Sequence, residues 1–284
     1  MKKLTGITAG IAMLILAVSA IRCSKNKYST PTTAAKLVQL QTSATLGKYL
    51  ADKDGHALYF FSNDANGQVS CTGGCATVWP PYNASSLTAD QVAAGLTLTD
   101  FGSAGTQVTY KGWPLYTYAP AGTQEAAGLT SGEGIAGIWF VAKPDYTIML
   151  SNTQLIGADG NHYKSDYTLG DGTTVYFTDA KGHTLYTFKK DSANINKFTK
   201  SDFSNNAVWP IYDTTAVVVP STMDKTLFTN TTVFGKSQLT YKGWPLYYYG
   251  ADSSIRAKTK GITVGGPGAF WPVAVAGAAP APHL

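Results

Sequence analysis

Two cysteines that stand four residues apart are the sharpest candidates for chemistry in this chain. Cys71 and Cys75 enclose a threonine and two glycines, which allow the sharp reversal that so short a spacer needs. The pair can form a structural disulfide, the state that an oxidising compartment favours. As thiolates the cysteines can instead bind copper or exchange electrons, although a two-cysteine copper site needs a third ligand. We expect the disulfide, with copper or haem handling as the alternative.

Two histidines in matching places form a second candidate site. His56 and His183 each follow a glycine between two strand-like segments. Equivalent histidines in a duplicated protein can meet as metal or haem ligands, with or without Cys71 and Cys75. The other interpretation leaves both exposed at hairpin ends, because neither has an evident carboxylate or cysteine partner. We expect the exposed arrangement and no resident metal or cofactor.

Three aspartates follow aromatic strand-like segments directly, at Asp64, Asp191 and Asp252. Such residues commonly make Asx turns, in which the carboxylate accepts from the backbone N–H two residues on. They can also bind calcium, but one carboxylate in each sequence copy is too few for a site. We expect turn chemistry.

Signatures of enzymes are missing from the sequence. It contains no Gly-x-Ser-x-Gly, no phosphate-binding glycine loop and no His-Glu-x-x-His. Glu125 and Glu133 are the only glutamates and lie in a glycine-rich segment, which is a poor place to hold two carboxylates for glycoside hydrolysis. We therefore expect no catalytic residue and no enzyme.

The N-terminal 22 residues have the pattern of an export signal: a lysine pair, then an apolar stretch that ends in small residues. Cys23 follows at once, as in bacterial lipoproteins, where this cysteine is acylated and becomes the new N-terminus. Arg22 departs from the small residue usual before that cysteine. Cleavage after Ala20, or retention of the stretch as an uncleaved anchor, are the alternatives.

The number of cysteines favours lipidation. There are three, and an acylated Cys23 leaves Cys71 and Cys75 to pair with each other. The expected partner is therefore the membrane, reached through the N-terminal lipid in the cell envelope, with the protein facing the periplasm or the extracellular side. Removing residues 1–22 leaves 19 basic against 17 acidic residues, and this net charge of +2 gives no case for nucleic-acid binding.

One pattern repeats four times and contains all six tryptophans. A glycine precedes a histidine or tryptophan, then Leu-Tyr-x-aromatic, and a further tryptophan follows 20 to 24 residues after that tyrosine. The first and third copies resemble each other, as do the second and fourth, so a pair of copies is used twice. The expected organisation is a signal peptide at 1–22, a lipidated cysteine and tether at 23–45, module 1 at 46–143, a connecting segment with a strand pair at 144–172, module 2 at 173–276 and a tail at 277–284.

The local pattern is β throughout. Alternating runs flank tight turns such as Lys53 to Gly55, and again Lys111-Gly112 and Lys242-Gly243 in the second half of each module. The period-two rule places Tyr59 and Phe61 on one face of their strand. Aromatic residues on both faces predict strands covered on both sides. We therefore expect an all-β protein of two tandem modules, each built from two hairpin-based repeats, as a sandwich, a barrel or a small propeller.

The repeats resemble a known family. Three copies fit Tyr-x-aromatic-x-x-Asp, and the sequence Tyr-Lys-Gly-Trp-Pro-Leu-Tyr occurs at 110–116 and at 241–247. With Cys71 to Cys75 and the following Trp79-Pro80-Pro81, these motifs resemble the bacterial secreted-repeat lipoprotein family with the Yx(FWY)xxD motif, which has no established function. The second copy lacks the aspartate, and module 2 lacks the cysteines. The motif residues are Tyr59, Phe61, Asp64, Tyr186, Phe188, Asp191, Tyr247, Tyr249 and Asp252.

Together these features predict a membrane-anchored envelope lipoprotein with a non-catalytic binding or scaffolding role, whose partner is an envelope protein or a small ligand. An envelope redox or metal-handling protein is the alternative. A glycan- or peptide-binding module is a third hypothesis, and it requires exposure of the repeat tyrosines Tyr59, Tyr116, Tyr186 and Tyr247.

Overall fold

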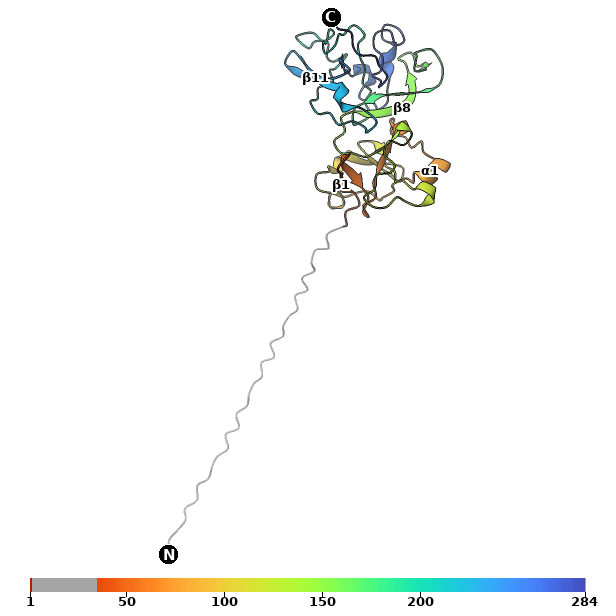
Figure 1. Cartoon of the computed structure of the whole chain (residues 1–284), viewed down its shortest axis with the longest axis vertical. Coiled ribbons are helices and arrows are strands. Elements are labelled where there is room, and N and C mark those ends of the chain that lie inside the picture. The colour runs from red at the N-terminus through yellow and green to blue at the C-terminus, as the bar shows by residue number, and fades with distance from the viewer. Residues whose placement is uncertain (2–34, 284) are drawn as a thin grey trace. The chain divides into compact units, whose positions relative to one another are not determined.

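The computed structural model describes Met1 and residues 35–283 (Figure 1). Residues 35–283 lie in one compact unit. The expected signal peptide apart from Met1, Cys23 and most of the expected tether lie outside the described residues. Within the described part of the chain, no helix is both long enough and apolar enough to cross a membrane.

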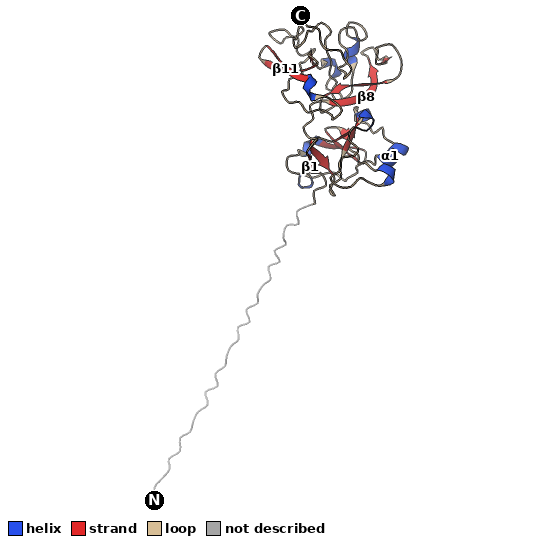
Figure 2. Ribbon diagram, viewed as in Figure 1, coloured by secondary structure: helices blue, strands red, loops and turns tan. Residues whose placement is uncertain are grey.

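Short strands joined by long loops and turns are the main regular structure, and the prediction of an all-β protein is confirmed (Figure 2). One short α-helix and several 3-10 turns accompany them. The strands are β1 Gln39–Ser43, β2 Gly47–Ala51, β3 Tyr59–Phe61, β4 Phe101–Ala104, β5 Gln107–Tyr110, β6 Trp113–Pro114, β7 Trp139–Val141, β8 Met149–Ile156, β9 His162–Tyr163, β10 Thr173–Thr178, β11 Phe228–Val233, β12 Lys236–Tyr241 and β13 Trp244–Pro245; the helices are α1 Gly74–Val78, η1 Ser62–Asp64, η2 Ala89–Gln91, η3 Leu98–Asp100, η4 Pro120–Gly122, η5 Ile135–Gly137, η6 Lys225–Leu227, η7 Gly250–Asp252 and η8 Lys260–Thr263.

The strands form small antiparallel sheets in the orders β1-β2, β3-β7, β4-β5-β6, β10-β8-β9 and β11-β12-β13. The predicted two-residue turns are present: Lys111 and Gly112 join β5 to β6 with φ of 50° and 80°, and Lys242 and Gly243 join β12 to β13 with φ of 49° and 83°. Two successive positive φ values give the type I′ turn, whose twist matches that of paired strands.

The two repeat copies of each module pair with each other through their central tyrosines. Tyr59 and Tyr116 exchange two backbone hydrogen bonds of 2.8 and 3.0 Å, and Tyr186 and Tyr247 do the same with identical lengths. Both pairs are antiparallel. A local two-fold relation between the copies therefore lies at the centre of each module.

Both faces of these central strands are covered, as predicted. Tyr59 and Phe61 belong to one aromatic cluster, whereas Leu58 and Phe60 belong to another. All three residues of β3 are buried. Among the architectures that the sequence leaves open, the modules are sandwich-like, with strands enclosed between two packed layers.

The connecting segment is part of the fold. Its strand β8 pairs with β9, as predicted, and also along its length with β10, the first strand of module 2. Neighbouring β8 residues serve different cores: Met149 packs with the module 1 cluster, and Leu150 packs with the module 2 cluster. The alternation of side chains along a strand makes β8 a shared wall between the modules.

Both ends of the expected domain plan need correction. The tether was expected to continue to residue 45, but β1 pairs with β2 and Val38 is fully buried. The tail at 277–284 was expected to be unstructured. It has no strand or helix in its described part, yet Ala281 is buried and its N–H donates to the carbonyl of Lys242 at 2.9 Å. Composition alone missed both, because short apolar side chains in a Ser-, Thr- or Ala-rich segment suffice to dock it on an existing core.

Candidate functional site

The aspartates of the repeat motif accept hydrogen bonds from tyrosines of the opposite copy. In module 2, the Tyr186 hydroxyl donates to Asp252 at 2.6 Å, and the Tyr247 hydroxyl donates to Asp191 at 2.8 Å. Because the two copies pair antiparallel, the end of each motif lies beside the start of the other. The motif is therefore a crossed pair that exists only when two copies associate.

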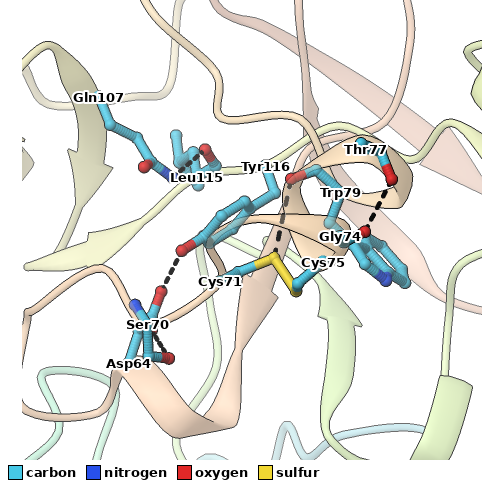
Figure 3. Close-up of a disulfide and its surroundings, with 10 residues drawn as sticks. All are labelled: Asp64, Ser70, Cys71, Gly74, Cys75, Thr77, Trp79, Gln107, Leu115 and Tyr116. Atoms are coloured by element: carbon cyan, nitrogen blue, oxygen red, sulfur yellow. Dashed lines mark hydrogen bonds between the residues drawn. A yellow bond between two sulfur atoms is a disulfide. The ribbon is translucent and has the colours of Figure 1, made fainter.

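Module 1 has the same crossed pair, with one substitution. The Tyr116 hydroxyl donates to Asp64 at 2.5 Å (Figure 3), and the Tyr59 hydroxyl donates to Glu125. Glu125 thus replaces the aspartate that the second copy lacks. The separation of 66 residues between Tyr59 and Glu125 equals that between Tyr186 and Asp252. Sequence reasoning judged the glycine-rich segment a poor place to fix two carboxylates for glycoside hydrolysis; the structure holds one of the two, Glu125, in a buried position.

The carboxylates also bind backbone N–H groups, but not those of Asx turns. Asp64 and Asp191 each accept from the N–H six residues on, at Ser70 and Lys197, with lengths of 2.8 and 2.7 Å. Asp252 accepts from Lys260, eight residues on, at 3.0 Å. The expected bond to the residue two positions on is therefore wrong. Each carboxylate closes a longer loop, and its two oxygens are already engaged.

Burial dominates the electrostatics of these acids. It raises the pKa of Asp191 to about 7 and that of Asp252 to about 6, even though hydrogen bonds from Lys197 or Tyr186 oppose the shift. Burial also raises the pKa of Asp64. The pKa of the Tyr247 hydroxyl is raised far beyond its ordinary value by burial and by the charge of Asp191. A raised carboxyl pKa suits general acid chemistry, but Asp64 and Asp191 lie in the core, and Asp252, which borders a pocket, has both carboxylate oxygens engaged.

The motif aromatics and the closing tryptophans form one stack in each module. In module 1, Trp79 and Trp139 lie parallel with ring centroids 3.8 Å apart. Phe61 covers Trp139 at 4.0 Å, and Tyr118 covers Trp79 at 4.4 Å. Each aromatic residue of a motif therefore stacks on the tryptophan that follows the other copy. The prediction that the tryptophans act as matching core residues is confirmed.

Module 2 repeats this stack ring for ring. Trp209 and Trp271 lie 3.6 Å apart, Phe188 covers Trp271 at 4.3 Å, and Tyr249 covers Trp209 at 4.4 Å. A glycine borders the stack: a methyl group added at Gly261 would meet Trp209 at 2.8 Å. The backbone must approach the rings closely here, so only glycine fits.

The four repeat tyrosines are not available to a ligand. Tyr59, Tyr116, Tyr186 and Tyr247 are all 0% exposed. The hypothesis of a glycan- or peptide-binding surface built on these tyrosines is therefore wrong.

Cys71 and Cys75 form the expected disulfide, which ties the segment before α1 to the first turn of that helix (Figure 3). Cys71 is buried beside Trp79, and Cys75 is half-buried. Disulfide sulfurs are not thiolates, so in this state the pair offers no copper ligand. Module 2 builds the same aromatic stack without cysteines, so the bond is an addition to the repeat and not a requirement.

The two histidines are half-buried and each has a carboxylate partner, contrary to expectation. His56 Nδ1 lies 3.0 Å from Asp52, and His183 Nδ1 lies 2.9 Å from Asp179. Each aspartate stands four residues before its histidine, across the hairpin turn, a spacing that sequence reasoning did not consider. In the described part of the chain, Asp52, Asp54 and His56 are the only group placed closely enough to share a metal ion. That group contains neither cysteine nor His183, so the ligand set of the metal-handling alternative is not assembled.

Arg256 joins the two modules and was missed by sequence reasoning. Its Nη1 donates to the carbonyl of Lys111 at 2.6 Å and to that of Lys181, and its guanidinium lies 4.7 Å from the Trp113 ring. A methyl group added at Gly112 would meet Nη1 at 2.7 Å, so this glycine leaves room for the arginine. Burial lowers the pKa of Arg256 to about 10, which leaves it charged at neutral pH. The sequence signal that could have drawn attention to Arg256 was the rarity of arginine, since Arg22 and Arg256 are the only arginines.

Fold and site together define a tandem-repeat all-β protein whose motif residues build its core. Residues 42–82 match the family model described as "Secreted repeat of unknown function". The matched segment runs from the end of β1 to just beyond Trp79, through the first motif copy and the disulfide. The family suggests an extracellular or envelope location. No curated protein and no solved structure matches the chain.

Proposed function

We propose that this protein is a lipid-anchored component of the bacterial cell envelope with a non-catalytic binding or scaffolding role. The observation that carries the proposal is the crossed tyrosine–carboxylate pair in the centre of each module. The most distinctive polar residues of the repeat are used to join its copies, as the bond from Tyr247 to buried Asp191 illustrates. A repeat whose signature residues hold copies together suits a scaffold that displays its loops and ends.

The positions of the acid–base candidates support a non-catalytic role. Asp64, Asp191 and Asp252 have raised pKa values, but all three are buried and hydrogen-bonded to tyrosines of the core. A general acid must reach the atom that it protonates. Glu133, the remaining glutamate, accepts from the N–H of Val141 at 2.6 Å and supports β7.

Anchoring through Cys23 is supported by the pairing of the other two cysteines. With Cys71 and Cys75 joined, Cys23 is the one cysteine left for acylation. The match of residues 42–82 to a secreted repeat agrees with export. An acyl anchor places the modules in the cell envelope, on the periplasmic or extracellular side.

Mass spectrometry of the mature N-terminus tests the anchor. The expected product begins at Cys23 and carries the added mass of two or three acyl chains. Cys23→Ser should abolish that mass and release the protein from the membrane fraction, whereas Cys75→Ser, the matched cysteine control, should stay membrane-bound. An unmodified N-terminus at Ile21, or an intact Met1, would contradict lipidation.

The scaffolding role is tested by proximity labelling in living cells. The tagged protein should label a reproducible set of envelope proteins, beyond those labelled by a signal-matched lipoprotein that carries an unrelated domain. Arg256→Ala, which removes one of the contacts between the modules and leaves both cores in place, should change that set. Identical labelling by the protein and the unrelated control would refute a scaffolding role.

A further inference from the structure

Module 2 has a pocket beside its histidine that the core does not use. It has a volume of about 320 Å³ and lies between the hairpin-end histidine, two tyrosine rings and the loop that follows the fourth motif. Its walls include His183, Pro210, Tyr248, Tyr249, Ser254 and Ile255. From this geometry we propose that the pocket binds a neutral cyclic polyol of monosaccharide size.

The histidine is oriented for binding by the aspartate behind it. Asp179 accepts from His183 Nδ1 at 2.9 Å and from the Tyr248 hydroxyl at 3.0 Å, both on the same oxygen. Its other oxygen accepts from two backbone N–H groups of the turn, at Lys181 and His183. With Nδ1 donating to a carboxylate, Nε2 is the ring nitrogen left for a ligand, as an acceptor in the neutral imidazole and as a donor in the charged one. A ligand hydroxyl suits both, because it can donate and accept.

The rest of the lining suits a polyol ring. Tyr248 and Tyr249 are half-buried and offer aromatic surface, on which the C–H face of a sugar ring can pack. Ser254 supplies a hydroxyl at the exposed side. Asp252 also lines the pocket, but its carboxylate is engaged by Tyr186 and by the N–H of Lys260. The lining therefore combines stacking surface with neutral hydrogen-bonding groups, and no free carboxylate attracts a cation.

Module 1 has the same hairpin framework, but a different side chain occupies the position of Tyr248. Thr117 stands where module 2 has Tyr248: each donates its N–H to the proline that follows the closing tryptophan, at 2.9 Å to Pro80 and 2.8 Å to Pro210. The loop to the acidic residue is longer in module 1, because Glu125 follows Tyr116 by nine residues and Asp252 follows Tyr247 by five.

A residue of that longer loop, Gln124, lies 3.4 Å from Asp52, the carboxylate that corresponds to Asp179. The side chain thus takes the contact that the Tyr248 hydroxyl makes in module 2. His56 is therefore the matched control for His183, with the same aspartate pairing but without the two-tyrosine wall.

This site rests on the binding role proposed above and gives it a ligand class. The test is saturation-transfer NMR on the purified full chain in detergent, with methyl β-D-glucopyranoside at millimolar concentration as the probe. The ring protons of the probe should receive saturation. His183→Ala should weaken binding by about fivefold or more, since one hydrogen bond and part of the wall are lost. His56→Ala should leave binding unchanged.

A second variant guards against a folding defect in the first. Ile255 is 52% exposed and lines the pocket, so Ile255→Trp should block the sugar without disturbing the core. No saturation transfer to the sugar, equal effects of His56→Ala and His183→Ala, or binding of phenol in place of the sugar would each overturn the assignment. Absence of sugar binding by a protein acylated at Cys23 would remove this site and leave the anchor intact.

Discussion

The two modules share their centre and differ at their ends. Both have crossed tyrosine–carboxylate pairs and a four-ring stack, with tryptophans 3.8 Å apart in module 1 and 3.6 Å apart in module 2. Only module 1 has a disulfide, and only module 2 has the pocket beside Tyr248 and Tyr249. The duplicated unit therefore tolerates changes in loop length and in the acid used, provided that the rings and the buried carboxylates stay in place.

The second hairpin of each module is covered by a different segment. Trp113 is fully buried, and its indole N–H donates to Ala180 of module 2 at 3.0 Å. Trp244 is half-buried, and its indole N–H donates to Ala279 of the tail at 2.8 Å. The tail thus covers the second hairpin of module 2, just as module 2 covers the second hairpin of module 1. It acts as a terminal cap does in a repeat protein.

The largest expected effect follows from the shared centre. Trp79→Ala and Trp209→Ala should each lower the free energy of unfolding by about 3–5 kcal/mol, because each removes a large ring from a filled stack. Trp244→Ala should cost clearly less, since its ring is half-buried. Chemical denaturation measures all three. If Trp209→Ala cost no more than Trp244→Ala, the stack would not be the core of the module.

The next effect on stability should come from the contact that Arg256 makes between the two modules. Arg256→Ala should lower stability by about 2–3 kcal/mol, because hydrogen bonds from a charged donor to two carbonyls are lost together with the contact to Trp113. It should also separate the unfolding of the modules into two transitions. Lys258→Ala, at an exposed neighbouring position, is the control. A single, unshifted calorimetric transition in Arg256→Ala would show that the arginine does not couple them.

The disulfide should have a smaller effect, confined to module 1. Replacing both Cys71 and Cys75 by serine should cost about 2 kcal/mol, since the bond closes a very short loop. Module 2, which folds its stack without cysteines, should keep its own transition. The same samples answer the metal alternative: stoichiometric copper or haem in the wild-type protein, lost in the Cys71→Ser variant, would favour a metal-handling role.

A pH dependence from Asp191 should be similar in size to the effect of the disulfide. Its pKa is about 7 in the folded protein, above its ordinary value of 3.8, so between these values the folded state holds a proton that the unfolded state has released. Its contribution to stability is therefore fully present below pH 3.8 and is lost as the pH rises through about 7. Between pH 5 and pH 8 the fall should be about 2 kcal/mol, because the folded state holds the extra proton over roughly two pH units.

Asp191→Asn should flatten this part of the profile, because an amide does not titrate and the Tyr247 hydroxyl can rotate to accept from it. Asp202→Asn, at an exposed aspartate whose pKa is lowered, should leave the fall unchanged. A wild-type stability that rises from pH 5 to pH 8 would contradict the raised pKa of Asp191.

The local sequence pattern was sufficient to predict the strands, but it did not predict the hydrogen-bond partners of polar side chains. The turns at Lys111-Gly112 and Lys242-Gly243, and the opposite faces of Tyr59 and Phe60, follow from rules that act over a few residues. Asp191 could be placed at the end of a strand, but its hydrogen-bond partner Tyr247 lies 56 residues away. Glu125 was not recognised as the acid of the second copy because its loop is longer than the motif allows, although its carboxylate reaches the equivalent place.

By itself the sequence determined that this is an all-β protein of paired repeats, with tryptophans and tyrosines as its main core residues, because alternation and spacing report which side chains face inward. Only the tertiary structure decided that each motif is completed by the other copy, that Arg256 spans both modules and that a pocket opens beside His183. The physical reason is that burial and hydrogen bonding depend on distances in space between residues far apart in the chain, and no local spacing encodes them.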